Sequence, residues 1–251
     1  MTIRGITFDF WDTIVRDETD EPKRAAAGLP SKAEARVSTF VDEVLVHHPD
    51  IGCDAACAAL DRANSTFRHN WKVEHRTPCV ADRLAVGFDV LGIARTPGFD
   101  GLVSAWETME VEIPPDLVPG IGDCLKSLHG RYKIGIISDA IVTPGTGLRQ
   151  ILRDYGLFQY FDHFVFSDEA GAAKPASRVF DLATSGLGVA ANELAHVGDR
   201  PANDIAGPNA YGSHSVLYTG VVDRRADGDP VASIHLTHMD DLAEAIAGFS
   251  Q

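Results

Sequence analysis

Acidic, hydroxyl and ammonium side chains stand at the ends of several short apolar stretches of the sequence. Asp9, Ser138 and Asp199 each follow such a stretch, and Lys174 lies in a loop after another one. In open α/β sheets, ligands bind outside the carboxyl ends of the strands. If these stretches are neighbouring strands, we expect two acidic ends, a hydroxyl and an ammonium to converge on one crevice.

Such a cluster favours metal-assisted chemistry at an aspartate. Carboxylates crowded together repel one another unless a cation binds, and hard oxygen ligands suit Mg²⁺. Lys174 can offset the remaining negative charge and hold a nucleophilic carboxylate in place. An aspartate used in this way can form a covalent intermediate, as in aspartyl-phosphate enzymes.

The elements that must position these residues alternate between strands and helices. The strand-like stretches are rich in Ile, Val and Phe, as strands buried on both faces should be, and cover 3–8, 132–137, 161–166, 194–197 and 215–218. Amphipathic helical stretches lie between the later ones, at 148–155, 178–185 and 202–210. This alternation predicts an α/β fold with a doubly wound parallel sheet between two helical layers, a three-layer sandwich.

The interval between the first two strands differs from the rest of the chain. It contains no convincing strand, and helical stretches are expected at 32–47, 54–71, 81–91 and 99–111. The first of these helices carries an apolar face formed by Val37, Phe40, Val41, Val44 and Leu45. We therefore expect a helical cap at 16–111, inserted into a core formed by 1–15 and 112–251.

Composition limits the class of protein and its partners. The 251 residues are 45% hydrophobic and 23% charged, a mixture typical of chains that bury a core. The net charge of -14 argues against nucleic acid and anionic membranes as partners. An anionic small molecule remains a suitable substrate, because a bound cation reverses the field locally. The absence of a signal-peptide pattern, a membrane span and a disulfide framework predicts a cytoplasmic protein.

The order of the chemical motifs resembles that of the haloacid dehalogenase-like hydrolases. Those four motifs are similar to Asp9 in its strand-end segment, Ser138, Lys174-Pro175 and the acidic turn 198–204. Each motif alone is weak, whereas all four in order are highly specific, and the resemblance runs from Ile3 to about Gly212. It implies a Rossmann-like core and places the chain in subfamily I, with a helical cap of the C1 type.

The resemblance also implies roles for individual residues. Asp9 would be the nucleophile, Ser138 would bind oxygens of the transferring group, and Lys174 would position Asp9. Mg²⁺ would be held by the Asp9 carboxylate, the main-chain carbonyl of Trp11 and Asp199. Asn203 or Asp204 would complete the shell directly or through water, although Asp204 is equally suited to cap the following helix. The Gly198-Asp199 form resembles the metal-dependent phosphatases more than the true dehalogenases, which work without a metal.

One position departs from the pattern of the family's phosphatases. Their second aspartate, a general acid and base two residues after the nucleophile, is replaced by Trp11, which we expect to form the floor or wall of the site. Asp12 is a candidate replacement for this acid, but the side chain of an adjacent residue normally points elsewhere. A positioned proton-transfer group contributes roughly 10²–10⁴-fold to the rate.

Three functions follow from this departure. The preferred one is a Mg²⁺-dependent phosphatase acting on a small phosphorylated metabolite. The second is hydrolysis of carbon–halogen bonds as in 2-haloacid dehalogenases, which also carry an aromatic residue at the Trp11 position. Asp139 and Asp199 stand against it, where those enzymes resemble Asn and Ser. The third is a weakly active family member that binds a ligand or a partner protein.

Several further residues have both a functional and an ordinary interpretation. Thr13 and Asp139 are candidate substrate-binding residues, but each is equally at home as a local turn former. His196 lies within a strand and is expected to be a satisfied core histidine. The basic and aromatic stretch 68–76 fits a solvated helix end better than a pocket wall. The stretch 224–230 is expected to be a solvated loop.

Overall fold

Runs of Ile, Val and Phe form one six-stranded parallel sheet in the computed structural model, which describes residues 2–248. The strand order is β3-β2-β1-β4-β5-β6. The strands are β1 (Gly5–Phe8), β2 (Lys133–Ser138), β3 (His163–Phe166), β4 (Leu194–Gly198), β5 (His214–Tyr218) and β6 (Ile234–Leu236). Phe8 of β1 aligns with Ile136 of β2 on one side and with Val197 of β4 on the other.

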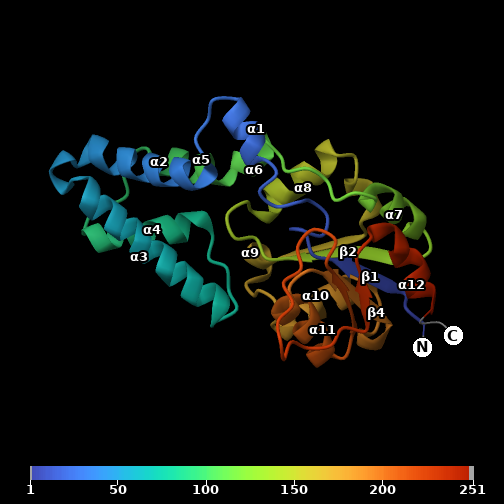
Figure 1. Cartoon of the computed structure of the whole chain (residues 1–251). Coiled ribbons are helices and arrows are strands. Elements are labelled where there is room, and N and C mark those ends of the chain that lie inside the picture. The colour runs from blue at the N-terminus through green and yellow to red at the C-terminus, as the bar shows by residue number, and fades with distance from the viewer. Residues whose placement is uncertain (1, 249–251) are drawn as a thin grey trace.

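Helices cover both faces of this sheet (Figure 1). Ile6, Phe8 and Ile136 point into a hydrophobic cluster with α7 (Ile121–Leu128), α8 (Gly145–Asp154) and α12 (Leu242–Gly248). Ile137 and Val165 point to the other face, where they pack against α10 (Ser177–Leu187). The short helices α9 (Ser167–Ala170) and α11 (Ala206–Tyr211) complete the core. The predicted Rossmann-like α/β fold is thus confirmed.

The ends of several elements differ from the sequence prediction. β1 begins at Gly5 rather than at residue 3, and the stretch expected as one helix at 202–210 is a π-helical turn, Pro201–Ile205, followed by α11. β6 was not predicted, because three residues, Ile234 to Leu236, are too few to show a strand pattern. Apart from β6, these differences concern element ends, which local patterns define least well.

The segment after β1 forms a separate helical body, called here the helical insert (Figure 1). Its hydrophobic cluster contains Phe40, Leu84, Phe88 and Trp106 and is distinct from those of the sheet. The insert consists of α1 (Glu21–Ala26), α2 (Lys32–His47), α3 (Cys53–Lys72), α4 (Val80–Leu91), α5 (Phe99–Glu107) and α6 (Met109–Glu112). The helix expected at 99–111 is broken at Thr108 into α5 and α6.

The N-terminal half of α2 differs from its predicted packing. Ser31 caps the helix by accepting a hydrogen bond from the Glu34 backbone, while the Glu34 side chain accepts one from Ser31. Val37, expected on the buried face, is 42% exposed. The buried residues in this half of α2 are Lys32 and Ala35, because a charged network occupies the insert–core junction there.

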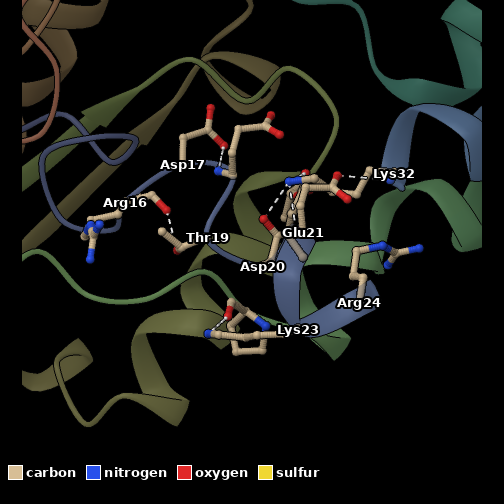
Figure 2. A network of polar contacts seen from close by, with 12 residues as sticks. Arg16, Asp17, Thr19, Asp20, Glu21, Lys23, Arg24 and Lys32 are labelled. Atoms are coloured by element: carbon tan, nitrogen blue, oxygen red, sulfur yellow. Dashed lines mark hydrogen bonds and ion pairs between the residues drawn. The ribbon is translucent and has the colours of Figure 1, made fainter. Parts of the chain in front are cut away.

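A charged network joins the start of the insert to its last helix, and Figure 2 shows two of its residues, Lys32 and Asp20. Lys32 Nζ lies 2.8 Å from a carboxylate oxygen of Asp20 and 3.2 Å from Glu110. Glu110 also pairs with Arg36 at 3.0 Å and accepts a hydrogen bond from Thr143, which lies after β2 in the core. The ion pairs therefore join the two ends of the insert, and the hydrogen bond from Thr143 connects this network to the core.

No helix within residues 2–248 combines the length and the apolar character needed to cross a membrane.

Candidate active site

Asp9 and Asp199 lie where the strand order of the sheet reverses. β1 stands between β2 and β4, Asp9 follows β1, Asp199 follows β4, and Ser138 ends β2. The helical crossovers diverge to opposite faces at such a point and leave a crevice at the carboxyl ends of the strands. The three side chains that sequence spacing predicted to be neighbours therefore come from three adjacent strands.

Lys174 connects two carboxylates at the bottom of this crevice. Its Nζ lies 2.7 Å from Asp9 Oδ1 and 2.7 Å from Asp204 Oδ1, and its side chain is only 2% exposed. Burial alone would lower the pKa of Lys174, but the carboxylates of Asp204 and Asp9 outweigh it and raise that pKa. Lys174 is therefore an ammonium that holds one oxygen of Asp9 in place.

Asp204 is fixed from several directions. Its Oδ1 also lies 3.2 Å from His196 Nε2, and its Oδ2 accepts a hydrogen bond from the backbone of Arg200 at 2.9 Å. Burial would raise the pKa of Asp204, but Lys174 and His196 outweigh burial and lower it. Because both oxygens are engaged, the geometry favours Asp204 as an anchor for Lys174 over a helix cap or a metal ligand.

His196 extends this chain of contacts into the sheet. It is fully buried, and its Nδ1 lies 3.0 Å from Thr7 Oγ1 on the neighbouring strand β1. Both ring nitrogens thus have partners, as expected for a core histidine. Burial lowers the pKa of His196 and so favours its neutral form.

Asp199 is the carboxylate with the least compensation. Its side chain is 1% exposed, and its Oδ1 has no hydrogen-bond partner among the described residues. Burial, followed by the charges of Asp204 and Asp9, raises the pKa of Asp199. One oxygen each of Asp9, Asp199 and Asp204 lies within 4.8 Å of the others. A hard divalent cation fits between Asp9 and Asp199, because it would satisfy the buried oxygen and relieve the repulsion.

Two buried hydroxyl groups of the segments that follow β1 and end β2 also lack a partner. Ser138 Oγ and Thr13 Oγ1 make no hydrogen bond to any atom of residues 2–248. Buried polar atoms are normally paired, so each hydroxyl has a hydrogen bond left to make. Both residues were candidate substrate-binding positions in the sequence.

Asp139 organises the mouth of the site. Its Oδ1 accepts a hydrogen bond from the Lys174 backbone at 3.0 Å. Its Oδ2 accepts bonds from Trp71 Nε1 at 2.8 Å and from Asn203 Nδ2 at 3.1 Å. Burial is the largest influence on the pKa of Asp139 and raises it. The residue thus links β2, the loop of Lys174, the acidic turn and the helical insert, which exceeds the ordinary turn role that its position after a strand suggests.

The space around Asp9 is narrow. A cavity of about 10 Å³ is lined by Asp9, Trp11, Trp71 and Lys174 among others. A neighbouring cavity of about 140 Å³ shares Trp11, Ile141 and Arg200 with it and extends towards the charged network of the insert. Trp11 therefore forms a wall between the two spaces, as its sequence position suggested. Trp71 belongs to the stretch 68–76, so the expectation of a merely solvated helix end was wrong for this residue.

Arg224 is one residue of the site that sequence reasoning missed, as are Trp71 and Arg200, which lines both cavities. The guanidinium of Arg224 donates to Asp199 Oδ2 at 2.5 Å and to Asp12 Oδ2 at 2.8 Å. The stretch 224–230 is a largely exposed loop, as expected, but its first residue lies against the acidic cluster. The only signal in the sequence is a pair of adjacent arginines in an acidic chain, and this pair does not specify a contact.

Asp12, the candidate replacement acid, is directed towards Arg224. Its Oδ1 accepts a hydrogen bond from the backbone of Asp17 at 2.9 Å, and its Oδ2 accepts from Arg224. The residue has a left-handed backbone with φ of 54° and does not line the small cavity around Asp9. This geometry does not favour Asp12 as a proton donor to a group bound at Asp9.

The fold and the site define an α/β protein with an acidic crevice at the reversal point of a parallel sheet. The chain belongs to the haloacid dehalogenase-like hydrolases, whose family model matches residues 3–212. The strands β1, β2 and β4, at whose ends Asp9, Ser138 and Asp199 lie, are all within the matched region.

Similar proteins include enzymes with different substrates. The chain is 37% identical over 92 residues to pyrimidine 5'-nucleotidase YjjG of Escherichia coli, a match covering 36% of this chain and 39% of that protein. Several such matches cover only 39% to 42% of the relative's own length. A longer match, 34% identical over 237 residues, covers 88% of this chain and 83% of haloacid dehalogenase-like hydrolase domain-containing protein 3 of Mus musculus.

A solved structure of similar fold is the 2-haloacid dehalogenase of Pseudomonas syringae. Its TM-score is 0.67 at 19% identity, and the alignment covers 99% of this chain and 100% of that one. At this identity the likeness concerns the fold alone.

Proposed function

We propose that this protein is a Mg²⁺-dependent phosphatase that hydrolyses a small phosphorylated metabolite through an aspartyl-phosphate on Asp9. The observation that carries the proposal is the 2.7 Å contact of buried Lys174 with Asp9, beside an Asp199 carboxylate whose Oδ1 has no partner within residues 2–248. This arrangement provides an oriented nucleophile and a place for a cation. A dianionic phosphoryl group requires both.

Each residue has a role in the proposed reaction. Asp9 attacks phosphorus, its carboxylate oxygen forms a bond to the phosphoryl group, and the P–O bond to the substrate breaks. The leaving oxygen departs with the bonding electrons and takes a proton from water, because no protein acid is placed at Trp11. Lys174 keeps Asp9 oriented and offsets negative charge, and the Ser138 hydroxyl donates to a phosphoryl oxygen. Water then hydrolyses the aspartyl-phosphate and regenerates Asp9. Mg²⁺, held by Asp9, Asp199 and the main-chain carbonyl of Trp11, would neutralise charge on the transferring group.

The helical insert is proposed to act as a cap over this site. Trp71 of α3 reaches Asp139 in the core, and the cavity around Asp9 is small. Closure of such a cap excludes water other than the attacking molecule. Opening of the cap is then needed for the substrate to enter.

Carbon–halogen hydrolysis is the second candidate. Trp11 supports it, because a halide ion leaves without needing a proton and an indole cannot supply one. The buried Asp199 supports the phosphatase, because a reaction without a metal has no use for a carboxylate whose Oδ1 has no partner within residues 2–248. The Escherichia coli relative also supports the phosphatase, because it is named a nucleotidase and a nucleotidase hydrolyses a phosphate ester.

The test is release of phosphate from p-nitrophenyl phosphate with Mg²⁺ and with EDTA. This leaving group needs no protonation, so the assay does not depend on the acid missing at Trp11. We expect turnover with Mg²⁺ and its loss in EDTA. Asp9→Asn should lower turnover by at least about 10³-fold, since it removes the nucleophile.

The matched control is Asp61→Asn on the exposed surface of α3, which should leave turnover unchanged. Asp9→Asn should also keep a cooperative thermal unfolding transition, so that loss of activity is not loss of fold. Retained turnover in Asp9→Asn would refute the proposed nucleophile. Halide release from haloacids in EDTA, without phosphate release, would favour the second candidate.

A further inference from the structure

The loop between β5 and β6 places the guanidinium of Arg224 against the acidic crevice. Arg224 spans two carboxylates from different segments, Asp199 after β4 and Asp12 after β1. The carboxylate side chains are 1% and 4% exposed, whereas that of Arg224 is 31% exposed. The contact therefore consists of two buried acceptors and one donor that reaches in from the surface.

This contact balances charge in the crevice. Asp9, Asp12, Asp199 and Asp204 lie together there, and Lys174 pairs with only Asp9 and Asp204. Arg224 is the cation that pairs with Asp12 and Asp199 among the described residues. A planar guanidinium that bonds two carboxylates at once is the most favourable side-chain partner for such a pair.

The tip of this loop is weakly attached to the core, although Val231 and Ser233 further along bond Asn209 and Ser215. Residues 225–228 are exposed, and their bonds are local, such as Ala226 N to Asp229 Oδ2 and Asp229 N to Ala226 O. Arg225, the next residue, pairs with Asp223 on the surface. Release of Arg224 would therefore disturb little apart from its own two ion pairs.

We infer that Arg224 is an internal counter-ion that occupies the metal-binding carboxylate Asp199 and is displaced when Mg²⁺ binds. The inference rests on the metal dependence of the proposed function. Arg224 holds Asp199 Oδ2, and Mg²⁺ would bind beside Oδ1 of the same carboxylate. The two cations therefore compete for one carboxylate, and the loop 219–233 determines how tightly the enzyme binds its metal. Before the metal binds, Arg224 prevents the buried carboxylates from repelling one another.

Competition between Arg224 and Mg²⁺ should change the apparent affinity of the protein for Mg²⁺. The apparent affinity of a ligand falls in proportion to the fraction of protein in the binding-competent state. If Arg224 occupies Asp199 about nine-tenths of the time, its removal should tighten Mg²⁺ binding about tenfold. The same removal should destabilise the protein without metal, because the carboxylates then lack a counter-charge.

The experiment is isothermal titration calorimetry, in which the full chain is titrated with Mg²⁺ alone. Arg224→Gln should bind Mg²⁺ about tenfold more tightly than the wild type. Arg224→Lys keeps the charge but loses the planar guanidinium that bonds both carboxylates at once. It should bind Mg²⁺ with an affinity between those of the wild type and Arg224→Gln. Arg225→Gln, the neighbouring surface residue, is the matched control and should bind like the wild type.

A second measurement is the unfolding temperature of the same proteins in EDTA and in saturating Mg²⁺. Arg224→Gln should unfold at a lower temperature than the wild type in EDTA, and the difference should shrink or vanish in Mg²⁺. Circular dichroism checks that each variant is folded. Unchanged or weaker Mg²⁺ binding by Arg224→Gln would overturn the inference, as would the absence of Mg²⁺ binding in all variants.

These outcomes are independent of the test of the proposed function. Tighter Mg²⁺ binding by Arg224→Gln in a protein that releases no phosphate would support the counter-ion and refute the phosphatase. Mg²⁺-dependent phosphate release with equal affinities in both proteins would support the phosphatase and refute the counter-ion.

Discussion

At the scale of single residues, a chain of contacts determines where the proposed nucleophile points. Thr7, His196, Asp204, Lys174 and Asp9 follow one another at distances between 2.7 and 3.2 Å. All five are buried, so each polar group depends on its neighbour for compensation. Asp9 is therefore held by side chains that the β1 and β4 strands and the Lys174 loop bring together.

Trp11 provides a test of the missing proton donor. Trp11→Asp places a carboxyl group where the family's phosphatases carry their acid, and such a group contributes roughly 10²–10⁴-fold. We expect turnover of an alkyl phosphate to rise at least about tenfold and that of an aryl phosphate to rise less. Steady-state rates with glycerol phosphate and p-nitrophenyl phosphate measure this difference.

The control for this prediction is Trp11→Asn, which has almost the same size as aspartate but no exchangeable carboxyl proton. It also loses the edge-on contact with Phe10, so it reports the cost of removing the indole. Equal effects of the two variants, or equal gains on both substrates, would show that proton donation does not limit the reaction.

At the scale of elements, buried charges join the two ends of the helical insert. Lys32 at the start of α2 is 4% exposed and pairs with Asp20, before α1, and with Glu110 in α6. The two ends of the insert thus meet at one ammonium. Breaking such a pair leaves uncompensated charge in a region that water does not reach.

Lys32→Met should lower the free energy of unfolding by about 3 kcal/mol, because Asp20 and Glu110 would remain buried with less compensation. Urea unfolding measures this change. Lys23→Met is the matched control: Lys23 pairs with Asp116 on the surface, with 38% and 52% of their side chains exposed. A surface pair contributes about 0–1 kcal/mol. A similar small loss in both variants would contradict a structural role for the buried network.

At the scale of the whole molecule, the insert lies close over the site. The cavity of about 10 Å³ at Asp9 is near the volume that one water molecule requires, which is less than a phosphoryl group needs. The 2.8 Å bond from Trp71 to Asp139 crosses from insert to core. We therefore expect this bond to favour the closed arrangement of the two parts.

Trp71→Phe removes the indole N–H and keeps an aromatic ring. A hydrogen bond to a charged group contributes about 1.5–3 kcal/mol, so weaker closure should lower kcat/KM about tenfold. Trp106→Phe is the control, because Trp106 is buried within the insert and donates to Thr39 instead of a core residue. It should lower stability and leave kcat/KM nearly unchanged. A kcat/KM that is equal in both variants would argue against closure through Trp71.

The order of the elements followed from local patterns. Buried parallel strands are short runs of Ile, Val and Phe, and amphipathic helices show a regular apolar period, so each type could be recognised within one stretch. The helix at Lys32–His47 was predicted with its observed ends. β6 was missed because it is short, and Val37 was misplaced because the charged junction changes which side of α2 is buried.

The sequence by itself determined the family, the α/β fold and the strand-end positions of Asp9, Ser138 and Asp199, because these depend on short motifs and local periodicity. Only the tertiary structure decided which charges meet. The pairing of Lys174 with Asp204, of Trp71 with Asp139 and of Arg224 with Asp199 joins residues 25 to 68 positions apart. Such contacts depend on how loops return to the sheet, and no local pattern encodes that geometry.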